Sequence, residues 1–250
     1  MEFKTLTVVN SRNSFHPLKV YQFLKDIGSK HIQFIPLVER MPDQSAQNFG
    51  LNFAAPPNRQ GRKQQETPVA QWSVKPRQYG VFLFDIFMNW IHNDLSRIFV
   101  YNFEEVLARW CGWEPTICVF NKTCGNAMVI EHNGDVYSCD HYVYPNYKIG
   151  NVMEQSVREM ALSVAQEKFG RDKFDTLPRY CLDCEVFHVC IGECPKYRFM
   201  KAPDGEEGLN YLCEGYKYLF KNIDPYMKKL AQQIRGEKNP PPFAFPQDSQ

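Results

Sequence analysis

Eight cysteines between residues 118 and 213 of this 250-residue chain have a spacing that could do chemistry. Two lie six residues apart, and a third stands in the pattern Gly-x4-Cys. Four form Cys-x2-Cys-x5-Cys-x3-Cys, and the last follows after eighteen more residues. A Cys-x2-Cys turn brings two sulfurs within reach of one metal or cluster, so eight thiolates divide naturally into two four-ligand sites. In chain order they are Cys118, Cys124, Cys139, Cys181, Cys184, Cys190, Cys194 and Cys213.

The spacing alone is compatible with three kinds of site. Two structural zinc ions would each take four thiolates, and two iron–sulfur clusters would take the same number. A disulfide framework is the third alternative, but the odd total of nine cysteines and the lack of an export signal weigh against it. The ninth, Cys111, lies beside Trp110 and Trp113 and is expected to be a small buried hydrophobe.

The composition narrows the classes of partner. Lys and Arg number 29 against 28 Asp and Glu, a net charge of +1, which gives no support to a nucleic-acid role. Polar residues interrupt every apolar stretch well before the roughly 18 residues of a membrane span, and the start lacks the apolar run of a secretory signal. We therefore expect a cytoplasmic protein that binds neither nucleic acid nor membrane.

The first forty residues predict one strand–helix–strand unit that must position part of the site. Residues 3–9 and 31–38 are apolar and β-branched, and between them a helical pattern begins at Pro17 and ends before Gly28. Two strands joined through one helix predict parallel pairing. Because two parallel strands need neighbours, and no further repeat of this kind is evident, the unit is expected to be a piece of a larger α/β sheet or barrel.

The rest of the chain predicts a polar loop, several helices and a hairpin. Asn133-Gly134 is a strong hairpin signal, because both residues tolerate positive φ. The apolar residues of 76–93 cover much of a helix, which should lie buried between two layers. The remaining predictions are a polar loop over 41–71, an amphipathic helix over 99–110, strands over 127–131 and 135–139, a helix over 152–169, a helix over 214–234 that can kink at Pro225, and a disordered tail over 236–250.

The cysteine order resembles a known domain. Cys-x15-Gly-x4-Cys, followed by Cys-x2-Cys-x5-Cys-x3-Cys and a distant cysteine, is similar to the SPASM domain, the C-terminal extension of many radical S-adenosylmethionine (SAM) enzymes. Further stretches are similar to one branch, the anaerobic sulfatase-maturating enzymes. They are EFKTLTVVN, HPLKVYQFLKDIGSKHIQFIPLVER, EHNGDVYSCDHYVYPNYKIGN, CPKYRF and NYLCEGYKYLF. The resemblance favours iron–sulfur clusters over zinc.

The resemblance implies an α/β fold class with two unequal parts. Residues 1–97 would be the remnant, comprising the last strands, of a partial (β/α)6 radical SAM barrel. Residues 98–235 would form a small Cys-rich α+β SPASM domain that holds two iron–sulfur clusters. Residues 236–250 would be the tail.

The resemblance also implies which residues serve which role. Cys118, Cys124, Cys139 and Cys194 would hold a first [4Fe–4S] cluster, whereas Cys181, Cys184, Cys190 and Cys213 would hold a second. Asp140 would be the general base, with a pKa raised by burial or nearby negative charge. His141 is expected only to support or pack. Glu39, Arg40 and Asn10 follow the two predicted strands as candidates for ligand contact, and no cofactor-binding residue is assigned. Glu193 departs from the family's commoner Cys-x-Gly-Gly-Cys.

One family motif is missing from this sequence. Radical SAM enzymes bind their SAM-cleaving cluster with Cys-x3-Cys-x2-Cys, which does not occur here; the first cysteine is Cys111. The resemblance therefore implies a C-terminal portion, or truncated chain, of an oxidoreductase that matures sulfatases by oxidising a Cys or Ser to formylglycine. SAM and a third [4Fe–4S] cluster would belong only to the full-length parent. Whether the chain is itself an enzyme is left open, since alone it should not cleave SAM.

The implied partners are a sulfatase polypeptide of Cys or Ser type as substrate and a reductant such as flavodoxin or ferredoxin. The alternative is a non-catalytic zinc or iron–sulfur module that binds a partner or relays electrons. Iron and sulfide content separates these two classes.

Overall fold

A small parallel sheet begins the fold in this computed structural model, which describes residues 2–42, 44–48, 50, 52–57, 68–125 and 127–236. Strand β1 (Lys4–Val9) pairs in parallel with β2 (His31–Pro36), and helix α1 (Pro17–Asp26) connects them, as predicted. Pro17 stands in the first turn of α1. Gly28 follows the helix with a φ of +86°, a conformation that costs glycine little.

A third strand extends this sheet, which the sequence did not predict. Strand β3 (Phe99–Val100) pairs in parallel with β2 and leads directly into helix α4 (Tyr101–Cys111). The predicted helix over 99–110 is therefore wrong in its first two residues, and so is the expectation that the strand–helix repeat ends with β2. The reason is tertiary: Phe99 N donates to Lys30 O, so pairing with the chain before β2 overrides the local helical pattern.

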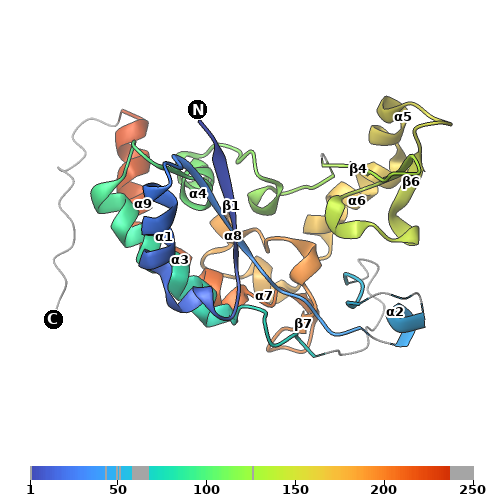
Figure 1. Ribbon diagram of the computed structural model, residues 1–250, viewed down its shortest axis with the longest axis horizontal. Coiled ribbons are helices and arrows are strands. Elements are labelled where there is room, and N and C mark those ends of the chain that lie inside the picture. Colours follow the sequence, from blue (N-terminus) through green and yellow to red (C-terminus); the bar gives the residue numbers. More distant parts are fainter. Residues whose placement is uncertain are drawn as a thin grey trace.

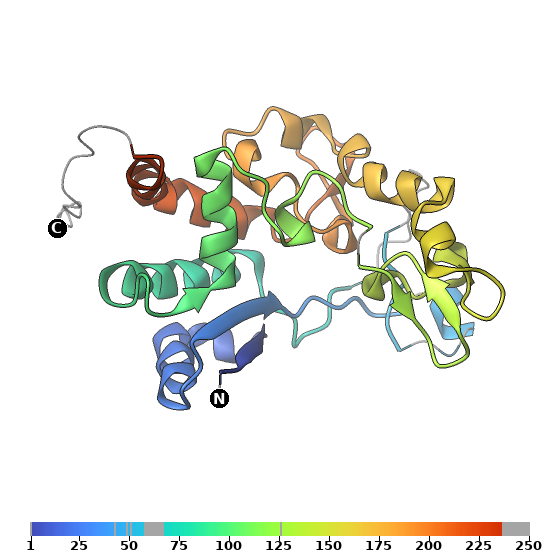
Figure 2. The same cartoon turned by 90° about the horizontal axis from the view of Figure 1, so that it is seen from above.

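Two long helices form the layer behind the sheet. Helix α3 (Pro76–Asn93) packs against α1 on one side and against α9 (Cys213–Ile234) on the other, which confirms the predicted burial between two layers (Figure 2). The helices cross at two glycines. A Cβ on Gly80 would lie 2.4 Å from the Gly215 carbonyl oxygen, so the close approach requires both residues to lack a side chain. Helix α9 continues through Pro225.

A second, antiparallel sheet carries the hairpin. Strands β4 (Val129–Ile130), β5 (Asp135–Tyr137) and β6 (Lys148–Asn151) pair in that order, so the predicted hairpin gains a third strand. This sheet lies at one end of the molecule, away from α1 (Figure 1). Between β5 and β6 come two single turns, η3 (Asp140–Tyr142) and η4 (Pro145–Tyr147).

The helix predicted over 152–169 is two helices. Helix α5 (Val157–Ala161) and helix α6 (Val164–Asp175) each begin at a serine N-cap. Ser156 forms a capping box with Glu159, and Ser163 accepts a hydrogen bond from the amide of Gln166. The apolar periodicity runs across both helices. The cap at Ser163 nevertheless starts a new helix, because the Ser163 side chain accepts a hydrogen bond from a first-turn amide that has no partner within the helix.

The rest of the described chain is made of short elements, three of which carry a cysteine. These are η2 (Cys118–Phe120), α7 (Arg179–Leu182), α8 (Phe187–Cys190), η5 (Pro195–Tyr197), β7 (Met200–Lys201) and β8 (Glu207–Leu209), with one further short helix, α2 (Gln44–Asn48), inside the predicted polar loop. An antiparallel bridge between Arg40 and Val69 joins the two ends of that loop. The predicted tail beyond residue 236 and residues 58–67 lie outside the described residues. Within the described part, no helix is long and apolar enough to cross a membrane.

Candidate iron–sulfur sites

Four of the eight cysteines line one cavity of about 280 Å³. Cys118 begins η2, Cys124 lies in the loop that follows it, Cys139 follows β5, and Cys194 precedes η5. We call these four the first set. Three segments far apart in the sequence, around residues 118–124, 139 and 194, thus bring four thiols to the wall of the same cavity. Thiolates are the ligand type that iron–sulfur clusters and structural zinc take, so this donor set fits either group.

A buried lysine organises the loop that carries Cys118 and Cys124. The Lys173 side chain of α6 is 0% exposed, and its Nζ donates to the carbonyl oxygens of Cys118, Val119 and Asn121. Burial and the positive charge of Arg198 lower the pKa of Lys173 to about 8. The ammonium thus replaces water for three carbonyls at once and fixes the shape of the loop.

Gly170 on α6 lets the loop that carries Cys118 and Cys124 lie close to the helix. The Cys124 amide donates to the Gly170 carbonyl oxygen at 3.2 Å. A Cβ on Gly170 would lie only 2.4 Å from the Cys124 carbonyl oxygen. The backbone of α6 therefore forms part of the scaffold of the first set.

The turn between Cys190 and Cys194 adopts an unusual backbone. Ile191, Gly192 and Glu193 all have positive φ, at +46°, +69° and +52°. For the two residues with a Cβ this conformation is strained and must be over-determined by contacts. The Arg198 guanidinium supplies such contacts, because Nε donates to the Gly192 carbonyl at 3.0 Å and Nη2 donates to the Glu193 carbonyl at 2.9 Å.

Glu193 itself is 3% exposed and lines the cavity of the first set. Its carboxylate accepts hydrogen bonds from the Cys194 amide at 2.5 Å, from Asn210 Nδ2 at 3.0 Å and from Tyr216 Oη at 3.1 Å. Burial raises the pKa of Glu193 despite these donors. Glu193 is thus a buried residue whose hydrogen bonds connect the turn at Cys194 to Tyr216 of α9.

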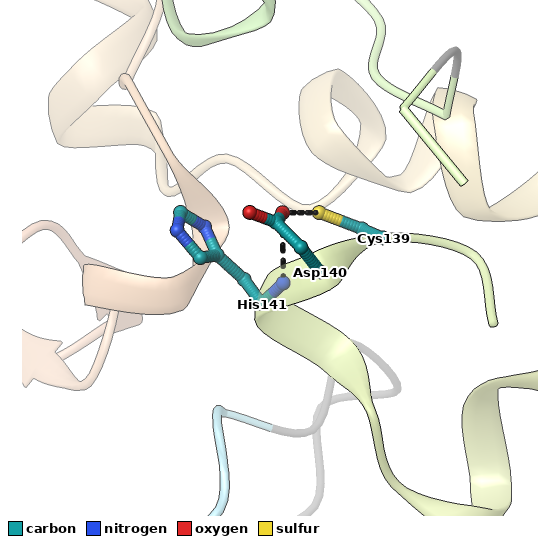
Figure 3. Close-up of side chains that lie close together, drawn as sticks. All are labelled: Cys139, Asp140 and His141. Carbon is teal, nitrogen blue, oxygen red and sulfur yellow. Dashed lines mark hydrogen bonds between the residues drawn. The ribbon is translucent and has the colours of Figure 1, made fainter. Parts of the chain in front are cut away.

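Asp140 and His141 lie on η3 at the edge of this cavity (Figure 3). The Cys139 thiol donates to Asp140 Oδ1 at 3.1 Å, and the His141 amide donates to the same oxygen at 2.9 Å. His141 Nδ1 lies 3.6 Å from Cys194 Sγ. One ligand atom from each of Cys139, Asp140 and His141 lies within 4.8 Å of the others, a spacing that can hold a metal ion.

The pKa of Asp140 differs from the sequence expectation. Burial raises it, but the hydrogen bond from Cys139 and the positive charges of His141 and Lys196 outweigh burial, so the pKa lies below its ordinary value. The pKa of His141 is lowered by burial and by Lys196. The sequence predicted the opposite direction for Asp140 because it did not anticipate the hydrogen bond from Cys139 or the approach of Lys196, which comes from a distant part of the chain.

A second cavity of about 280 Å³ lies on the other side of η3 and shares Asp140 and His141 with the first. Glu39 and Arg40 line it, and Glu39 pairs with Lys196 at 3.3 Å. These two candidates therefore lie beside Asp140. Asn10 lines neither cavity and instead holds a turn, where its Oδ1 accepts from the Arg12 amide at 2.8 Å.

The other four cysteines form a second group, the second set. Cys181 lies in α7, Cys184 follows α7, Cys190 ends α8, and Cys213 begins α9. Burial raises the pKa of Cys181 to about 12, with further contributions from the nearby thiolates of Cys213 and Cys184. Burial likewise raises the pKa of Cys190, helped by Cys213 and Cys181. Each of these four thiols therefore lies near at least one other member of the second set.

The first set shows the same internal coupling. Burial raises the pKa of Cys194 to about 12, and Cys118 adds to the shift. Burial raises the pKa of Cys139, and Cys194 adds to that shift. Cys190 and Cys194 are thus near neighbours in sequence but interact with different thiols. Cys111 is separate from both sets; it ends α4 and is buried in the core.

Sequence reasoning missed the residues that support the thiols. Lys173 lies beyond the helix predicted over 152–169, and Asn210 and Tyr216 precede and follow Cys213 without a metal-binding or catalytic motif of their own. Arg198 lies in the CPKYRF stretch, where a charge next to aromatic residues does not reveal that it is buried. Charged residues are rarely buried, so sequence alone assigns them to the surface.

Comparison with known proteins agrees with the cysteine geometry. Residues 118–185 match the SPASM family, described as an iron-sulfur cluster-binding domain. The chain is 41% identical over 240 residues to the serine-type anaerobic sulfatase-maturating enzyme of Bacteroides thetaiotaomicron, a match that covers 96% of this chain and 56% of that enzyme. It is 27% identical over 237 residues to the cysteine-type enzyme of Clostridium perfringens, covering 94% of this chain and 58% of that enzyme.

The fold is similar to that of a solved structure. Native anSMEcpe with bound AdoMet and Cp18Cys peptide superposes with a TM-score of 0.73 at 27% identity, over 93% of this chain and 58% of that one. The chain therefore spans a little more than half the length of the relatives it matches.

Proposed function

Because its homologues over most of its length are anaerobic sulfatase-maturating enzymes, we propose that this chain supplies two auxiliary [4Fe–4S] sites and the general base of such an enzyme. The first set would hold one cluster and the second set the other. The substrate would be a Cys or Ser side chain of a sulfatase polypeptide, which is oxidised to formylglycine. A flavodoxin or ferredoxin would act as reductant.

The observation that supports this proposal most strongly is that four thiols and the Asp140 carboxylate line a single cavity. Cys118, Cys124, Cys139 and Cys194 line it together with Asp140. A cluster held there would offer an acceptor for the electron that remains after the substrate has lost a hydrogen atom and a proton. The closeness of Asp140 to the thiols supports this assignment, since the base must act within reach of the reacting group.

Asp140 is oriented for proton transfer by its own backbone. The His141 amide holds Oδ1 at 2.9 Å, so the carboxylate keeps its position when the Cys139 thiol gives up its proton to become a ligand. Asp140 borders both cavities, and the cavity lined by Glu39 and Arg40 leaves a route to the carboxylate that the thiols do not line. The proposed substrate would enter from that side, and Asp140 would take the proton of its hydroxyl or thiol.

Metal and sulfide analysis of anaerobically reconstituted protein tests the two sites. We expect about eight irons and eight sulfides per chain, the content of two [4Fe–4S] clusters. About two zinc ions without sulfide would instead support the alternative of a structural metal module. Because Cys-x3-Cys-x2-Cys does not occur in the sequence, the 250-residue chain with SAM and a strong reductant should yield no 5′-deoxyadenosine.

A chimera tests the base. The chain would replace the matching region of the Bacteroides enzyme, and formylglycine formation in a Ser-type peptide would be followed by mass spectrometry. Asp140→Asn should lower the rate by about 100-fold or more, in the range of general base catalysis, while the iron content stays unchanged. An active Asp140→Asn chimera would contradict the assignment, and Asp26→Asn, which changes an exposed carboxylate at the end of α1, is the matched control.

A further inference from the structure

We propose that His141 is a positioning residue of the first set, whose ring N–H donates a hydrogen bond to the Cys194 thiolate and raises the reduction potential of the group held there. The inference rests on the proposed function, because it requires a cluster at the first set. Its geometric basis is the 3.6 Å separation between His141 Nδ1 and Cys194 Sγ. This distance falls within the range of N–H···S contacts.

The chemistry of the ligand fixes the direction of this hydrogen bond. A free thiol and an imidazole can each donate to the other, but a thiolate bound to iron has no proton and can only accept. Nδ1 of His141 must therefore carry the hydrogen when Cys194 is a ligand. The remaining ring nitrogen, Nε2, is then the one available to the second cavity, which His141 also lines.

The local fold holds the ring in this position. His141 is the middle residue of η3, and its amide is fixed by the Asp140 carboxylate at 2.9 Å. Its ring lies 6.5 Å from the Tyr197 ring, centroid to centroid, on η5 immediately after Cys194. The His141 imidazole thus connects η3, which carries Asp140, with the segment that carries Cys194. Figure 3 shows His141 beside Asp140 and Cys139.

The hydrogen bond from His141 to Cys194 is expected to change the reduction potential of the cluster held by the first set. A donor to a ligand sulfur withdraws electron density and stabilises the more negative, reduced state, so hydrogen bonds to cluster sulfurs raise the potential. A higher potential makes the first site a better acceptor for an electron that leaves a substrate beside Asp140. The residue next to the base would in this way favour electron transfer toward the first set over the second.

Two substitutions separate the hydrogen bond from the bulk of the side chain. His141→Leu removes the donor, whereas His141→Asn keeps an N–H at about the position of Nδ1. Reconstituted protein of the full 250-residue chain would be titrated anaerobically, with both clusters followed by EPR. We expect His141→Leu to shift the first potential to more negative values, His141→Asn to restore most of the shift, and the second potential to stay constant as an internal reference.

The outcomes are distinguishable. Equal first potentials in wild type and His141→Leu would overturn the inference and leave the proposed function intact. Loss of one iron per chain in His141→Leu would identify His141 as a ligand and also overturn it. A wild-type chain that binds no cluster at the first set would refute the proposed function itself. Should His141→Leu not fold, the Fe–S stretching bands of the wild type give a second readout, and identical bands in H₂O and D₂O would contradict the hydrogen bond.

Discussion

The two cysteine sets are built in different ways. The first set draws its thiols from three segments, around residues 118–124, 139 and 194, and buried polar side chains surround it. The second set takes three of its four thiols from residues 181–190, and its neighbour Glu185 forms exposed ion pairs with Lys217 and Lys221. One site depends on the tertiary fold, and the other depends mainly on local turns.

This difference indicates where each site is vulnerable. Buried polar groups that lose their partners cost the full desolvation penalty, whereas exposed ion pairs contribute little. Lys173 and Lys221 make the comparison direct, because both are lysines near a cysteine set. Lys173 is 0% exposed and Lys221 has a side chain that is 51% exposed.

The largest effect is expected from Lys173→Met. Methionine fills similar space but leaves the carbonyls of Cys118, Val119 and Asn121 without their donor. These carbonyls are only partly buried, so at about 1 kcal/mol for each, the low end for an unsatisfied group, the free energy of unfolding should fall by about 3 kcal/mol. We expect the melting temperature to drop by roughly 6–12 °C, and iron content to fall from about eight to about four per chain.

The iron content and EPR signals of Lys173→Met show whether Lys173 supports the first set alone. Loss of iron with an unchanged second EPR signal would show that Lys173 serves the first set alone. Full iron content and wild-type stability in Lys173→Met would contradict the view that a buried cation shapes the loop of Cys118 and Cys124.

The same contrast explains what the sequence could predict. Local signals were sufficient for β1, α1, β2, α3 and the Asn-Gly hairpin, because alternation, proline, glycine and helical periodicity act over a few residues. Local signals failed at Phe99–Val100, where strand pairing with β2 overrides a helical pattern, and at Ser163, where a cap divides one apolar pattern into two helices.

The candidate site was likewise predictable only in part. The cysteine pattern predicted the donor types and their order, since ligand spacing is written directly in the sequence. The buried partners Lys173, Arg198 and Glu193 could not be foreseen, because their burial results from α6, η5 and α9 meeting around the thiols. The direction of the Asp140 pKa was likewise not predicted, because it depends on the hydrogen bond from Cys139 and on the charges of His141 and Lys196.

A smaller and more local effect is expected from Gly170→Ala. The added Cβ would lie 2.4 Å from the Cys124 carbonyl oxygen, so the loop of the first set must move away from α6. Overpacking of this kind costs about 1–3 kcal/mol. We expect slower reconstitution of the first cluster and a lower melting temperature. The exposed neighbour Arg171, paired with Glu167 at 3.3 Å, provides the control: Arg171→Ala should change neither quantity measurably, and equal effects would refute the close-approach argument.

The smallest effect is expected from Lys221→Met beside the second set. Its Nζ lies 3.1 Å from Glu185 Oε1, but both side chains are about half exposed, and Lys217 remains as a second partner for Glu185 at 3.5 Å. Exposed pairs contribute about 0–1 kcal/mol, and salt screens them further. We therefore expect wild-type iron content and a melting temperature that is unchanged at high salt. Loss of iron at the second set in Lys221→Met would show that the Glu185 ion pairs position Cys184, and the contrast between a tertiary and a local site would then fail.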